Sequence, residues 1–78
     1  MPRIPNVPGP YRLHFFSADC SEPMHIHAQR DDHRCKFWLN PVTLAHNDGF
    51  SPAELRRIRE TILEFMPDIV EVWRAYCR

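Results

Sequence analysis

The hydrophobic pattern of this chain changes its period once, and that change constrains the fold more than any other feature. Up to about residue 46, apolar side chains tend to recur at every second position, as in strands with one buried face. After Ser51 they recur three and four positions apart, which is typical of amphipathic helices. Strands followed by helices predict an α+β fold: a small antiparallel sheet of three or four strands, then two C-terminal helices packed on one face.

Three segments show the alternation of half-buried strands, and a shorter fourth segment follows them. The predicted strands lie at residues 11–16, 24–30 and 34–39, with the short one at 42–45. Connecting loops or turns are expected at 17–23, 30–33 and 46–49. Residues 24–39 should therefore form an antiparallel hairpin. The proline-rich leader, residues 1–10, should be extended and could lie along an edge of the sheet.

The helical part begins with a clear start signal. Ser51 and Glu54 match the two ends of a capping box, and Pro52 occupies the first helical position. Pro67 interrupts the ladder of backbone hydrogen bonds, so two helices are expected, at 52–65 and 67–77. All 78 residues fit one domain, divided into the leader 1–10, the sheet 11–46 and the helical part 51–77.

Composition narrows the classes of protein that fit. Ten basic and ten acidic residues cancel, so any binding of nucleic acid needs a local patch. No apolar run is long enough for a signal peptide or a membrane span, which predicts a cytoplasmic protein without membrane contact. The three cysteines are odd in number and widely spaced, so we expect reduced thiols. A chain this short is expected to self-associate or to bind a partner protein.

His25 and His27 are the candidate functional pair. Strand alternation places both imidazoles on the face opposite Ile26. Three hypotheses remain open for them. They could be structural, or they could hold a metal ion with further donors from His14, Asp19, Glu22, His33 or Cys35. They could also act as acid and base in metal-free RNA cleavage, with a phosphate held by Arg30 or Lys36 and a base stacked on Trp38.

An ordered set of short motifs resembles one bacterial family. These motifs are Gly9-Pro-Tyr11, Glu22-Pro-Met-His-Ile-His27, Lys36-Phe-Trp-Leu-Asn-Pro-Val42, Gly49-Phe-Ser51 and Glu54-Leu55, with Trp73 near the end. Together they resemble domain of unknown function 4160. The chain departs from the family pattern at Met24, Gln29 and Asn40, where proline, glutamate and aspartate are usual. Losing the last two acids weakens mechanisms that would use them as ligands or bases.

The resemblance implies a small bacterial cytoplasmic protein, often encoded beside a second short protein, domain of unknown function 2442, in an arrangement like a toxin–antitoxin module. It implies a functional patch at the motif positions but no established catalytic residue and no known cofactor. We therefore expect a toxin-like component that acts on RNA or the translation apparatus if it is an enzyme. Its candidate catalytic residues are His25 and His27, and its candidate binding residues are Glu22, Arg30, Lys36 and Trp38. The alternatives are a non-catalytic antitoxin or regulator that binds a partner, and a small metal-binding protein that uses His25 and His27.

Overall fold

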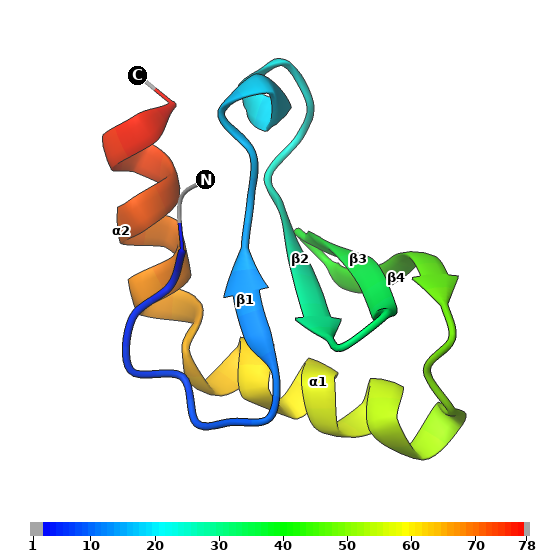
Figure 1. The fold of residues 1–78 in the computed structure, drawn as a ribbon. Helices are drawn as coiled ribbons and strands as arrows, with labels where there is room; N and C mark the ends of the chain where they lie inside the picture. The colour runs from blue at the N-terminus through cyan, green and yellow to red at the C-terminus, as the bar shows by residue number, and fades with distance from the viewer. Residues whose placement is uncertain (1–2, 78) are drawn as a thin grey trace.

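The computed structural model describes residues 3–77, apart from the side chains of residues 17 and 18, and it has the predicted α+β architecture. Four antiparallel strands form one sheet in the order β1-β2-β3-β4, and two helices follow (Figure 1). The strands are β1 (Arg12–His14), β2 (His25–Arg30), β3 (His33–Leu39) and β4 (Val42–Asp48). The helices are α1 (Pro52–Glu64) and α2 (Met66–Tyr76), and a short 3-10 helix, η1 (Ser17–Ser21), joins β1 to β2.

The sheet is built from the hairpins that the turn residues predict. Arg30 pairs with His33, so Asp31 and Asp32 alone form the first turn, and Asp31 takes a positive φ of 54°, which aspartate tolerates. The second hairpin turns at Asn40-Pro41. Its register shifts by one residue between Lys36 and Phe37, which is a β-bulge.

The core lies between one face of the sheet and the two helices. All residues of this core are apolar and less than a tenth exposed. They are Ile4, Tyr11, Leu13, Phe15, Ile26, Ala28, Cys35, Phe37, Leu39, Phe50, Ile58, Ile62, Ile69 and Trp73. The alternation of the strands determines which strand residues join this set. Phe15 packs its ring 5.0 Å from that of Trp73 on α2, and burying such a side chain stabilises the fold by about 2 kcal/mol.

Both helix boundaries agree with the predicted ones to within two residues. At the start of α1 the Ser51 side chain accepts a hydrogen bond from the Glu54 backbone N–H at 3.2 Å, and the Glu54 side chain accepts one from the Ser51 N–H. Pro67 stands at the start of α2, where a missing N–H costs nothing. None of the helices in residues 3–77 is long and apolar enough to cross a membrane.

The leader lies along the outer edge of β1, as its extended character allowed. The Ile4 N–H donates to the Leu13 carbonyl at 2.9 Å, Arg3 forms a bridge with His14, and the Ile4 side chain is buried. Residues 1 and 2 of the predicted leader fall outside the described residues. The leader therefore adds an apolar side chain to the core and covers one of the two sheet edges.

Three local expectations were wrong. The first strand is shorter than 11–16, and the fourth is longer than 42–45, since it continues through the expected turn to Asp48. The loop at 17–23 contains η1. The fourth strand continues because the bulge lets Lys36 pair with His46, so the ladder proceeds past Ala45.

Candidate functional site

The two motif histidines lie on β2, at its first and third residues, and their side chains share one face of the sheet. Ile26, between them, is fully buried on the opposite side. Although both imidazoles share one face, their surroundings differ. The side chain of His25 is 0% exposed and that of His27 is 22% exposed. The difference arises because η1 and two tryptophan rings cover His25, with Trp38 at 5.6 Å and Trp73 at 5.3 Å from its ring.

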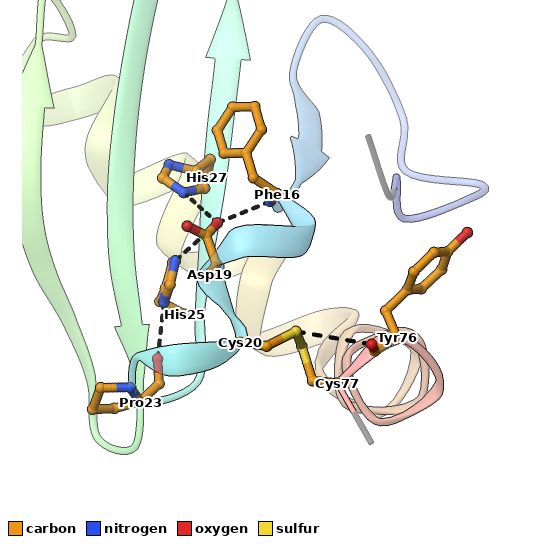
Figure 2. Close-up of a disulfide and its surroundings, with 8 residues drawn as sticks. All are labelled: Phe16, Asp19, Cys20, Pro23, His25, His27, Tyr76 and Cys77. Atoms are coloured by element: carbon orange, nitrogen blue, oxygen red, sulfur yellow. Dashed lines mark hydrogen bonds and ion pairs between the residues drawn. A yellow bond between two sulfur atoms is a disulfide. The ribbon is translucent and has the colours of Figure 1, made fainter.

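Asp19, on η1, brings a carboxylate to both histidines (Figure 2). Its Oδ2 atom lies 3.1 Å from Nε2 of His25 and 3.1 Å from Nε2 of His27. The same oxygen accepts a hydrogen bond from the Phe16 backbone N–H at 2.8 Å, which holds the carboxylate in place. We call Asp19, His25 and His27 the carboxylate–histidine cluster. Its three ligand atoms all lie within 4.8 Å of one another.

The hydrogen bonds around His25 decide its tautomer. Its Nδ1 lies 2.8 Å from the Pro23 carbonyl oxygen, and a carbonyl only accepts, so Nδ1 carries a proton that it donates. In the neutral ring, Nε2 is then a bare lone pair. That lone pair is buried without a hydrogen-bond partner and faces the Asp19 carboxylate at 3.1 Å. Two acceptors at this distance repel each other, so the contact requires a positive charge between them.

The pKa shifts in and beside the cluster favour an ionised Asp19 carboxylate and neutral imidazoles at His27 and at the neighbouring His14. Burial by itself would raise the pKa of Asp19, but the hydrogen bond from Phe16 and the contacts with both histidines outweigh it and lower the pKa below its usual value. Burial lowers the pKa of His27, although Asp19 opposes the shift. Burial, then the neighbouring charges of His27 and Arg12, lower the pKa of His14 to about 4.

A row of histidine and lysine side chains crosses the same face beside the cluster. His14 pairs with His27, His27 with Lys36, and Lys36 with His46, so one residue from each strand contributes. Together with Phe16, Gln29, Arg34 and Cys35, these residues line a hollow of about 450 Å³, which we call the basic hollow. None of these lining residues is acidic. His27 belongs to both the hollow and the carboxylate–histidine cluster, so it joins the two.

Three of the four predicted binding residues adjoin the cluster. The Lys36 ammonium lies 2.7 Å from a Glu22 carboxylate oxygen and 4.4 Å from the centre of the Trp38 ring. The hydrogen bond from Lys36 lowers the pKa of Glu22. Arg30 does not join them. It projects to the helix side of the sheet, where it forms an ion pair with Glu54 on α1.

Two of the other donors that the sequence left open, His33 and Cys35, lie elsewhere. His33 packs its ring 5.6 Å from that of Phe50, and Cys35 is buried in the core. Asp19 was only one of five possible partners for the two histidines, because the local sequence does not show how η1 folds back over β2. Arg34 and His46 were not predicted as site residues. Alternation along β3 could have placed Arg34 beside Lys36, but His46 joins the row only through the bulge.

The expectation of three reduced thiols was wrong. Cys20 on η1 and Cys77 after α2 form a disulfide across 57 residues (Figure 2). The Tyr76 carbonyl oxygen lies 3.9 Å from Sγ of Cys20, but a disulfide sulfur has no proton to donate, so this is a contact and not a hydrogen bond. Because Cys20 directly follows Asp19, the disulfide ties the turn that carries the cluster's carboxylate to the end of α2.

Comparison with known proteins identifies one family. The family model described as "Domain of unknown function (DUF4160)" matches residues 11–74, a range that contains the sheet, the cluster and almost all of both helices. No curated protein matches this chain. No solved structure matches it either.

Proposed function

This chain belongs to the DUF4160 family, and from that premise we propose that it is a toxin-like component of a bacterial toxin–antitoxin-type module that acts on RNA at the carboxylate–histidine cluster. The observation that carries the proposal is the position of His27, which lines the basic hollow and also contacts Asp19. A substrate held in the hollow would therefore meet the reactive cluster through this one exposed imidazole.

The basic hollow has the chemistry that a single-stranded RNA backbone requires. Arg34 supplies a full positive charge for phosphates, Lys36 supplies one that Glu22 already contacts at 2.7 Å, and His46 adds an imidazole ring. Phe16 is 45% exposed at the rim, with its ring 5.1 Å from that of His27, and can stack a base. The hollow thus pairs electrostatic contacts with one stacking surface, which is the usual composition of sites that bind single strands.

The roles of the three cluster residues follow from their burial. His27 is the exposed member, so it is the cluster residue that would lie nearest the scissile phosphodiester. Asp19 orients His27 through its Nε2 atom. His25, fully buried against Trp38 and Trp73, lies 3.1 Å from the Asp19 carboxylate and does not reach substrate.

The test compares growth arrest and RNA cleavage between variants that fold. Inducing wild-type protein should arrest growth, and His27→Ala should lower the rate of RNA cleavage by about 10² to 10⁴, the usual contribution of one catalytic group. Arg34→Ala should weaken RNA binding and reduce the salt slope by about 0.7, the value for one lost phosphate contact with a single strand. Arg56→Ala is the matched control, since it removes an exposed arginine from α1, outside the hollow.

A non-catalytic antitoxin or regulator is the second candidate, and one observation favours a partner. β4 is the last strand in the sheet order, and its residues after Val42 are exposed, so its outer edge can pair with another chain. A folded His27→Ala variant that still arrests growth and cleaves RNA at the wild-type rate would overturn the catalytic proposal. Co-purification of a small neighbouring protein without growth arrest would favour this second candidate.

A further inference from the structure

We propose that Asp19, His25 and His27 bind a divalent first-row transition metal ion of the zinc type. The inference deepens the proposed function by naming the cofactor of the same site. It rests on that function only for the use of the ion, because binding itself can be measured without RNA.

The two distances from the Asp19 carboxylate to the imidazoles fit a metal that is bonded to all three side chains. Zinc bonds to imidazole nitrogen and carboxylate oxygen are about 2.0 to 2.2 Å long. Two ligand atoms 3.1 Å apart, as between Asp19 Oδ2 and each Nε2, would subtend about 100° at an ion with such bonds. This angle lies between the tetrahedral and octahedral values. The two Nε2 atoms lie within 4.8 Å of each other, and two such bonds span at most about 4.4 Å, so any separation beyond that has to close as the ion binds.

His25 supplies an independent reason to expect an ion. Its Nε2 atom is fully buried, has no hydrogen-bond partner and faces the Asp19 carboxylate, and in a ring that is protonated on Nδ1 alone this atom is an acceptor. A buried acceptor in this position is costly unless a cation satisfies it. Its Nδ1–H donates to the Pro23 carbonyl, which is the outer contact that orients metal-binding histidines in proteins. A metal between Nε2 and Oδ2 would remove the repulsion without a proton on His25.

The donor set selects the class of ion. Imidazole nitrogens suit zinc and its first-row neighbours, whereas magnesium and calcium prefer oxygen ligands. Three protein ligands also leave coordination positions for water or substrate, as in catalytic zinc sites. His27 reaches the cluster from the basic hollow, so the open positions would face the place where we propose that RNA binds.

Metal binding should be measured on untagged protein with the Cys20–Cys77 disulfide intact, so that neither a histidine tag nor those thiols bind the metal. Titration calorimetry with Zn²⁺ and elemental analysis of the dialysed complex are expected to give one ion per chain, with no binding of Mg²⁺. His27→Gln and Asp19→Asn should each weaken Zn²⁺ binding by at least about 100-fold, since each removes one of three ligands. His46→Ala is the matched control, because it removes a histidine from the same face without touching the cluster.

Nitrogen NMR of the histidine side chains provides the second measurement. With Zn²⁺ bound, His25 should carry a proton on Nδ1 alone, and its Nε2 signal should shift on metal binding. The proposal is overturned if wild-type protein binds no stoichiometric Zn²⁺, if both cluster variants bind it as tightly as wild type, or if His25 carries protons on both nitrogens in the presence of Zn²⁺. RNA cleavage without metal binding would refute this inference alone. Metal binding without growth arrest or RNA cleavage would support it and count against the proposed function.

Discussion

The disulfide between Cys20 and Cys77 leads to the most quantitative prediction. It closes a loop with a sequence separation of 57 residues. In the chain-entropy description, a disulfide lowers the conformational entropy of the unfolded state by about 2.1 + 1.5R ln n cal/mol/K, where n is the number of residues in the closed loop. For this loop the effect stabilises the fold by about 4 kcal/mol at 25 °C. A domain of this size changes its Tm by about 4 to 8 °C for each kcal/mol, so reduction should lower the Tm by about 15 to 30 °C.

The assay is urea and thermal unfolding followed by circular dichroism, with and without a phosphine reductant. The Cys20→Ser variant is the control, because the reductant should no longer change its unfolding midpoint. Mass spectrometry after alkylation of the denatured protein should find one free thiol before reduction and three after it. Equal midpoints for the oxidised and reduced protein, or three free thiols in the unreduced one, would refute the reasoning.

Three further predictions concern single residues. Gly49→Ala should destabilise the fold by about 1 to 3 kcal/mol, because φ at Gly49 is +105° and a Cβ there would lie 2.5 Å from the His33 ring. Gly9→Ala is the control and should not destabilise the fold, because a Cβ at Gly9 would have nothing within 4 Å. Urea unfolding measures the stability of both variants. Burial raises the pKa of the Cys35 thiol to about 11, so the folded protein should resist iodoacetamide at pH 8 and react only when unfolded, as counted by mass spectrometry. Ser51→Ala should cost about 1 kcal/mol in the same unfolding assay through loss of the helix cap.

The local sequence pattern was sufficient to predict those structural features that depend only on neighbouring residues. Alternation along β2 predicted that His25 and His27 share a face opposite Ile26, and the capping box predicted the start of α1. Both depend on backbone geometry over a few residues, which repeats in the same way in any protein. The order of periods then sufficed for the fold class, because a sheet with one apolar face has to be covered by the amphipathic helices that follow it.

Only the tertiary structure decided the composition of the site. Asp19 reaches both histidines because η1 folds over the start of β2, and His46 joins the basic row because a bulge adds one residue to β4. Cys20 meets Cys77 because α2 ends beside η1, far away along the chain. Such contacts depend on how loops close and how elements pack, and many closures are nearly equal in free energy until the whole core forms. The residue types in the motif thus determined which chemistry is available, and the tertiary packing decided which side chains lie together in the site.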